Sequence, residues 1–154
     1  MYKASHISKS LQGRPLLKDI SLTCAPGECI ALTGPNGAGK TVLLKALSLV
    51  NPPTAGTITF GPNSYHFSAN ENGPQKPPPW PDLTFVFQQL FLWPNMTLRD
   101  NITLAARLQP HDVHAHDITA RFEQLVSKLG LQDLMDRYPN EVSGGQRQRA
   151  ALVR

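Results

Sequence analysis

The stretch Gly34-Pro35-Asn36-Gly37-Ala38-Gly39-Lys40-Thr41 decides the fold, because it matches the pattern G-x-x-x-x-G-K-[ST] at every fixed position. A short apolar run, residues 28–33, comes directly before it, and an apolar helical pattern from Lys40 to Leu49 follows it. A buried strand, a glycine-rich loop and a helix in this order predict a P-loop core of the α/β class.

Each residue type in this loop has a physical role in binding phosphate. Glycines let the backbone curl so that successive N–H groups point inward at phosphate oxygens, and the N-terminal end of the next helix adds a positive dipole. Lys40 supplies a point charge for the β- and γ-phosphates, and the Thr41 hydroxyl is a ligand for Mg²⁺. The loop predicts a site for a nucleoside triphosphate with Mg²⁺. By itself it fits GTPases, small-molecule kinases and many ATPases.

The segments around the loop indicate how the core is completed. Residues 28–33 and 83–87 are apolar runs that predict buried parallel strands. Residues 1–25 and 56–61 alternate in a way that predicts a flanking antiparallel patch. Residues 70–81 are rich in Pro, Asn and Gly, and we interpret them as an exposed connector rather than a polyproline ligand for a partner.

The second half of the chain has helical patterns. Thr97 and Asp100 have the spacing of a capping box at the start of one helix, and an apolar stripe that ends at Gly130 predicts a second. Ser143 can cap a third helix that runs to the last residue. The stretch 111–116 contains three histidines, and its spacing fits no zinc pattern, so we interpret it as a solvated connector between helices.

Composition and charge limit the class of protein. The chain has 154 residues, of which 40% are hydrophobic and 17% charged, as expected for one soluble globular domain. Its net charge of +4 suits an anionic ligand, and because no Lys/Arg cluster is longer than residues 147–149, we expect no nucleic-acid partner. No apolar leader or membrane-spanning run is visible, which favours a cytosolic protein. We interpret Cys24 and Cys29 as small core residues in a reducing compartment.

A second motif narrows the function. Val142-Ser143-Gly144-Gly145-Gln146-Arg147-Gln148-Arg149 places a capping residue and two glycines at the start of a helix, which makes a second anion-binding end. Its segment Ser143-Gly144-Gly145-Gln146 resembles the signature of the ABC ATPase family, with Val142 where leucine is commoner. Gln88, at the end of a predicted strand, resembles the family's Q-loop glutamine, and residues 93–101 resemble the start of its helical subdomain. The resemblance covers essentially the whole chain, with the motifs in the family's order.

This resemblance implies a role for each motif. Two such domains would pair head to tail and hold ATP between the P-loop of one and the signature of the other. Lys40 and Gln88 would be the catalytic residues present, and Thr41 and Gln88 would coordinate Mg²⁺. The ATP and Mg²⁺ site would consist of Gly34, Pro35, Asn36, Gly37, Ala38, Gly39, Lys40, Thr41 and Gln88. The partner domain's ATP would be contacted by Ser143, Gly144, Gly145 and Gln146.

The resemblance also implies a domain plan and partners. Residues 1–89 would form the β patch and P-loop core, and residues 143–154 the signature helix. Residues 90–142 would form a helical subdomain with a groove for a transmembrane permease subunit. The protein would lie in the cytoplasm, attached peripherally to the inner face of the cell membrane.

Three departures from the family pattern change these expectations. Leu11 stands where an aromatic residue usually stacks on adenine, and Val42 stands where a second hydroxyl residue is common. The family's apolar strand ending in Asp-Glu, with the general-base glutamate, and its switch histidine have no counterpart in the chain. We therefore expect an N-terminal portion with an incomplete parallel sheet that does not hydrolyse ATP by itself.

The leading hypothesis is the ATP-binding subunit of an ABC transporter. Residues 85–101 look somewhat like those of importers of polar amino acids, which favours import. An ABC-class ATPase acting on DNA or in translation is the alternative; the chromosome-acting branch is disfavoured, because about 100 residues without heptads separate Thr41 from Ser143. A truncated or split gene product without function remains open as well.

Overall fold

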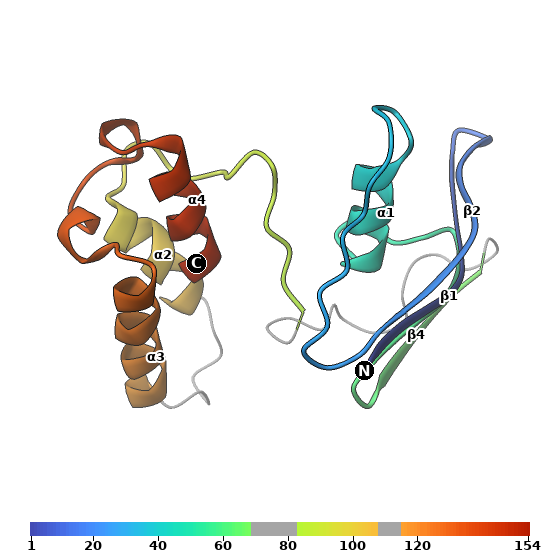
Figure 1. Cartoon of the computed structure of the whole chain (residues 1–154), viewed down its shortest axis with the longest axis horizontal. Coiled ribbons are helices and arrows are strands. Elements are labelled where there is room, and N and C mark those ends of the chain that lie inside the picture. Colours follow the sequence, from blue (N-terminus) through green and yellow to red (C-terminus); the bar gives the residue numbers. More distant parts are fainter. Residues whose placement is uncertain (69–82, 108–114) are drawn as a thin grey trace. The chain divides into compact units, whose positions relative to one another are not determined.

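The structure is a computed structural model that describes residues 1–68, 83–107 and 115–154, except for the side chains of residues 105–107 and 115–119. The described chain forms two compact units, Met1–Phe85 and Val86–Arg154, and each is treated by itself (Figure 1). Two of the sequence interpretations, the connector at 70–81 and the histidine side chains of 111–116, lie outside the described residues.

The first unit contains a four-stranded antiparallel sheet with the strand order β2-β1-β3-β4. β1 pairs with β2 on one side and with β3 on the other, so that Ala4 lies between Leu22 and Ile58. The sheet confirms the antiparallel patch predicted from the alternating residues, and β4 adds a strand that was not predicted. The strands are β1 (Tyr2–Leu11), β2 (Arg14–Cys24), β3 (Ala55–Phe60) and β4 (Asn63–Phe67).

β1 has an irregularity where its backbone approaches Gly56 of β3. The register between β1 and β3 shifts between Ser5 and Ser8, and His6 has a positive φ of 56°. A Cβ at Gly56 would lie 2.7 Å from the carbonyl oxygen of His6 and 2.8 Å from that of Ser5, and Gly56 itself has a φ of 119°. Only glycine fits this position, because any side chain would collide with backbone atoms.

Helix α1 (Lys40–Leu47) packs against the sheet through its apolar face (Figure 1). The Tyr2 hydroxyl donates to the carbonyl of Leu47 at the C-terminal end of the helix (2.5 Å). Burial of this phenol raises its pKa, because the charged form loses its hydration. The buried core of the first unit joins residues of helix and sheet: Ala4, Ile7, Leu17, Leu43, Ala46, Leu49, Ile58 and Tyr65.

The predicted parallel strands at 28–33 and 83–87 are not formed in the structure. An apolar run becomes a strand only when a neighbouring strand accepts and donates its backbone hydrogen bonds. Among the described residues no strand runs parallel to either segment. As a result Ile30 and Leu32 are 48% and 39% exposed, and Cys29 is also exposed. Cys24 is half-buried, so the interpretation of both cysteines as core residues is wrong.

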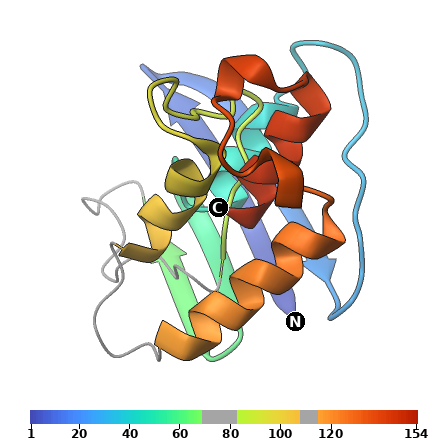
Figure 2. The ribbon, with the colours of Figure 1, turned by 90° about the vertical axis from the view of Figure 1, so that its left-hand side faces the viewer.

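The second unit is helical, as the sequence predicted. Its core joins the three helices with the turns between α3 and α4, and Figure 2 shows α3 (orange) and α4 (red). The helices are α2 (Leu98–Arg107), α3 (Ala115–Lys128) and α4 (Gly144–Val153), and short 3₁₀ turns span Gln132–Leu134 and Pro139–Glu141. The buried core residues are Leu98, Ile102, Val126, Leu131, Met135, Val142 and Ala150. Within the described ranges, no helix is both long and apolar enough to cross a membrane.

Candidate nucleotide-binding site

The loop before α1 has the left-handed backbone that its glycines permit. Gly37 has a φ of 82° and Gly39 a φ of 87°, values that side chains make costly. A Cβ at Gly39 would also lie 3.5 Å from Cδ2 of Leu17 and 3.6 Å from the carbonyl oxygen of Leu16, since β2 runs close by. The loop between Gly34 and Ala38 is exposed. Its curled, open backbone is the form that the sequence motif predicted.

Gly39 begins helix α1 without any side-chain cap. The first intrahelical bond runs from the N–H of Leu43 to the carbonyl of Gly39 (2.8 Å). The N–H groups of the preceding helical residues have no acceptor within the helix, which is a general property of helix ends. With no cap beside them, these N–H groups and the helix dipole favour an anion at this end.

The Lys40 side chain folds back over the loop. Its ammonium Nζ donates to the carbonyl oxygens of Gly34 (2.8 Å) and Pro35 (2.7 Å). The positive charge is thus held beside the curled backbone. Thr41 follows on the helix with an exposed side chain. The eight residues Gly34–Thr41 therefore form one continuous segment of the first unit, in which the start of a helix and one cation lie close together.

Val42 and Leu11 are two positions near the loop where the sequence departs from the family pattern, and the structure shows where each side chain lies. Val42 packs against the core of the first unit, so an apolar side chain there contributes to burial. Leu11 is 59% exposed at the end of β1, where Gln12 and Gly13 turn the chain into β2 with φ values of 49° and 77°. An aliphatic side chain at this turn offers apolar contact but no aromatic face.

Gln88 lies in the second unit, in an exposed bend before α2. Phe87 and Phe91 lie on either side of Gln88 in the sequence. Their rings pack edge to face with centroids 5.2 Å apart, which holds this segment in a bend. The Gln88 side chain is exposed.

The start of α4 is closed by a reciprocal capping box. The hydroxyl of Ser143 accepts from the N–H of Gln146 (3.3 Å), and the Gln146 side chain accepts from the N–H of Ser143 (2.7 Å). Between them Gly144 and Gly145 are exposed. The Arg147 guanidinium donates to the carbonyl of Val142 (3.0 Å), which fixes the approach to the helix. The predicted signature residues therefore form one exposed turn.

The second unit also contains a buried polar residue that the sequence analysis did not single out. Asn101 is completely buried, and its amide oxygen accepts from the N–H of Trp93 (2.7 Å). Its amide nitrogen donates to the carbonyls of Trp93 (3.0 Å), Met96 (3.1 Å) and Thr97 (2.9 Å). The signal was present in the sequence, because Asn101 lies on the same helix face as Leu98 and Ile102, both of them core residues.

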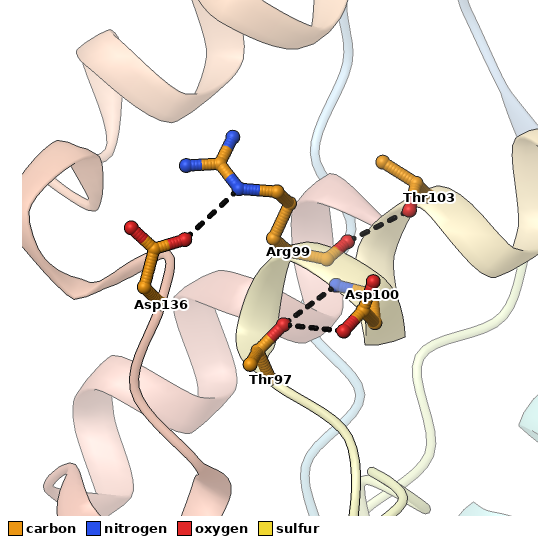
Figure 3. A network of polar contacts seen from close by, with 5 residues as sticks. All are labelled: Thr97, Arg99, Asp100, Thr103 and Asp136. Carbon is orange, nitrogen blue, oxygen red and sulfur yellow. Dashed lines mark hydrogen bonds and ion pairs between the residues drawn. The ribbon is translucent and has the colours of Figure 1, made fainter.

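Polar contacts at the start of α2 link this helix to residues 135 and 136, which precede α4 in the sequence (Figure 3). Thr97 caps the helix, since its hydroxyl oxygen accepts from the N–H of Asp100 (3.1 Å) and its O–H donates to the Asp100 carboxylate (2.8 Å). Arg99 forms an ion pair with Asp136 (Nε to Oδ1, 3.1 Å). The backbone N–H of Arg99 also donates to the carbonyl of Met135 (2.8 Å). The bond from the Asp100 N–H confirms Thr97 as the predicted cap, and the Asp100 carboxylate contacts the Thr97 hydroxyl.

A family model and similar curated proteins both point to the same family. A family model described as "ABC transporter" matches residues 17–154. The sulfate/thiosulfate import ATP-binding protein CysA 2 of Rhizobium meliloti (strain 1021) is 38% identical over 154 residues, which cover 99% of this chain and 40% of that protein. The arginine transport ATP-binding protein ArtP of Escherichia coli (strain K12) is 37% identical over 138 residues, covering 90% of this chain and 57% of that protein. The chain thus spans about half the length of these relatives or less.

Solved structures share the fold. The dimeric structure of MJ0796, a bacterial ABC transporter cassette, superposes with a TM-score of 0.71 at 24% identity, covering 99% of this chain and 68% of that one. A post-hydrolysis state of the same cassette, bound to ADP and Pi, gives a TM-score of 0.73.

Proposed function

Since the chain belongs to the ABC transporter family, we propose that it is the nucleotide-binding part of the ATP-binding subunit of a membrane importer. The observation that carries this proposal is the loop Gly34–Thr41, where an uncapped helix end, a curled backbone and the Lys40 ammonium meet. The import direction is supported by a relative named as a sulfate/thiosulfate import protein, and the relative named as an arginine transport protein supports a role in transport.

In this proposal the loop binds the phosphates of ATP with Mg²⁺. The backbone N–H groups of the loop face phosphate oxygens, and Lys40 exchanges its two carbonyl partners for oxygens of the β- and γ-phosphates. Thr41, with its exposed hydroxyl, and Gln88 are the proposed Mg²⁺ ligands. Lys40 neutralises developing charge and Gln88 orients the attacking water.

We propose two kinds of partner. A second domain of the same type would pair head to tail, so that Ser143, Gly144, Gly145 and Gln146 contact its ATP; a relative of the same fold is described as dimeric. Permease subunits would dock on the helical subdomain, proposed as residues 90–142 between a core of 1–89 and a signature helix of 143–154. This arrangement places the protein at the cytoplasmic face of a membrane.

The isolated 154-residue polypeptide is proposed to bind ATP without turning it over. Its sequence contains no apolar run ending in Asp-Glu, the element from which the family takes its general base. Loss of a positioned general base costs roughly 10²–10⁴ in rate.

Calorimetry with ATP and Mg²⁺ tests the proposal. We expect binding to the wild-type chain, and Lys40→Ala to weaken it by roughly 10- to 160-fold, because a charge-assisted contact contributes about 1.5–3 kcal/mol. Lys45→Ala is the matched control, since Lys45 is a lysine of the same helix but lies in its last turn. Thermal unfolding of all three proteins checks that the variants remain folded.

Two results would contradict the proposal. Equal ATP affinity of wild type and Lys40→Ala would remove the loop as the phosphate site. Phosphate release by the wild-type polypeptide at the rate of an intact transporter ATPase, abolished by Lys40→Ala, would show that the chemistry rests on other residues than those proposed.

A further inference from the structure

Two cysteines flank a tight turn at the end of β2. Cys24 is the last residue of the strand, and the N–H of Glu28 donates to the carbonyl of Ala25 (3.1 Å), which closes a four-residue turn. Gly27, with a φ of 77°, follows Pro26, and this is the arrangement of a type II turn. Cys29 comes directly after the turn, so one cysteine precedes the turn and the other follows it.

The thiol of Cys24 points across the turn. Its Sγ lies 3.7 Å from the carbonyl oxygen of Ala25 and 3.6 Å from that of Glu28. The second carbonyl belongs to the peptide that leads into Cys29, and standard peptide dimensions place the Cα of Cys29 about 2.8 Å from this oxygen. The Cys24 sulfur is therefore no more than about 6.4 Å from the Cys29 Cα. In a formed disulfide this sulfur-to-Cα separation is about 4 Å, so the pair has at most about 2.4 Å to close, in a segment that no strand among the described residues holds.

The turn is held in place while both thiols remain free. The Glu28 carboxylate accepts from the N–H of Ala25 (2.7 Å), which adds a second link across the turn. Cys29 is exposed and Cys24 is half-buried, and neither is in a disulfide. A reagent in solution therefore meets Cys29 first, with Cys24 close behind it.

We propose that Cys24 and Cys29 are a thiol–disulfide pair that is oxidised by a low-molecular-weight disulfide such as glutathione disulfide. The Cys29 thiolate attacks one sulfur of the reagent, its S–S bond breaks, and one glutathione thiol leaves. The Cys24 thiolate then attacks the Cys29 sulfur of this mixed disulfide, and the second glutathione leaves. The two cysteine protons end on the two glutathione thiols, so the protein loses two electrons and the reagent gains them.

The crosslink would act on the segment that leads into the phosphate loop. Cys29 begins the segment 29–33, which has no strand partner among the described residues and continues directly into Gly34. A bond to Cys24 would tie the beginning of this segment to β2, which already approaches the loop at Gly39 through Leu16 and Leu17. Oxidation is therefore expected to slow hydrogen exchange of the amides in 29–33.

The experiment follows the intact mass of the reduced 154-residue chain during incubation with glutathione disulfide, in native buffer and in urea, with acid quenching. The wild type is expected to lose two hydrogens without retaining glutathione, and dithiothreitol should reverse this. Cys24→Ser and Cys29→Ser are matched variants that should stop at one glutathione per chain, with Cys29→Ser reacting more slowly because Cys24 is half-buried. The ratio of internal disulfide to thiols should be at least about tenfold higher in native buffer than in urea, since a disulfide that fits the native geometry is linked to folding.

Three outcomes would overturn the proposal. Wild-type chains that keep one or two glutathione groups would show that the thiols do not reach each other. Covalent dimers on a non-reducing gel would show that they pair between chains. An internal disulfide that is no more favoured in native buffer than in urea would show that the turn does not bring the cysteines together.

Discussion

Asn101→Ala removes the side chain that holds the loop before α2, and the structure gives the size of the effect. Four hydrogen bonds join this fully buried side chain to backbone groups of Trp93, Met96 and Thr97. A buried polar group left without a partner costs about 1–3 kcal/mol. Because Trp93 is 53% exposed, water can reach part of the loop. If two of the groups stay unpaired, we expect a loss of roughly 2–6 kcal/mol from the free energy of unfolding of the second unit.

Urea unfolding followed by the fluorescence of Trp93 measures this loss. A Trp80→Phe background leaves Trp93 as the single tryptophan, so the signal reports on the second unit. With a denaturant dependence of about 2 kcal/mol per molar urea, the midpoint should fall by roughly 1–3 M. Asn95→Ala is the matched control, since Asn95 is an exposed asparagine of the same loop and should change stability by less than about 0.5 kcal/mol.

Asn101→Asp separates hydrogen bonding from side-chain volume. The aspartate keeps the shape and the acceptor for the Trp93 N–H, but it places a carboxylate oxygen against three carbonyls. Burial and these carbonyls raise its folded-state pKa above the unfolded value of about 3.9, so stability is retained below that pH and lost as pH rises above it. Equal urea midpoints for Asn101→Ala and Asn95→Ala would refute the reasoning.

Three further predictions concern a glycine of the sheet, the contact of Tyr2 with α1 and the cap of α4. Gly56→Ala should destabilise the first unit by about 2–4 kcal/mol in urea unfolding, because its Cβ would collide with the carbonyls of Ser5 and His6, whereas Gly61→Ala, which has open space, should cost about 1 kcal/mol. Burial raises the pKa of Tyr2 in the folded state, so the free energy of unfolding of the wild type should fall as pH rises above about 10. Tyr2→Phe should lack this part of the loss, and parallel pH profiles of the two urea midpoints would contradict the prediction. Ser143→Ala should cost the second unit about 1 kcal/mol and Ser143→Asn much less, since either an alcohol or an amide oxygen can accept from the Gln146 N–H; an unchanged midpoint for Ser143→Ala would argue against the cap.

The features that the sequence predicted correctly are those decided within a few residues. The cap of α2 depends on Thr97 and Asp100, which were recognised from their spacing, and the cap of α4 depends on Ser143, which was recognised as a capping residue before a helix. The left-handed loop at Gly39 is likewise a local consequence of glycine. In the candidate site, therefore, the shape of the phosphate loop and of the signature turn was accessible from sequence, whereas the roles of these residues toward ATP stay predictions.

The features that the sequence missed depend on residues far apart in the chain. The runs at 28–33 and 83–87 have the composition of strands, but a strand also needs a partner, and composition does not supply one. Gly56 is required because the irregular part of β1, at Ser5 and His6, lies against it. These residues are about fifty positions away in the chain, so the sequence around Gly56 does not indicate the contact. Asn101 was visible as a polar residue on an apolar stripe, but its partners follow only from the path of the loop.

The two helix ends that the proposal assigns to ATP differ in a way that supports unequal roles. At α1 the N-cap residue is Gly39, which has no side chain to cap the helix, and Lys40 adds a charge, so an anion meets the first N–H groups of the helix and a cation in one place. At α4 the N–H of Gln146 is already bonded to the Ser143 hydroxyl, and an anion finds chiefly the exposed Gly144 and Gly145. The first end is therefore suited to hold a triphosphate by itself. The second is suited to add contacts to a phosphate that another domain already holds, which is what head-to-tail pairing would require.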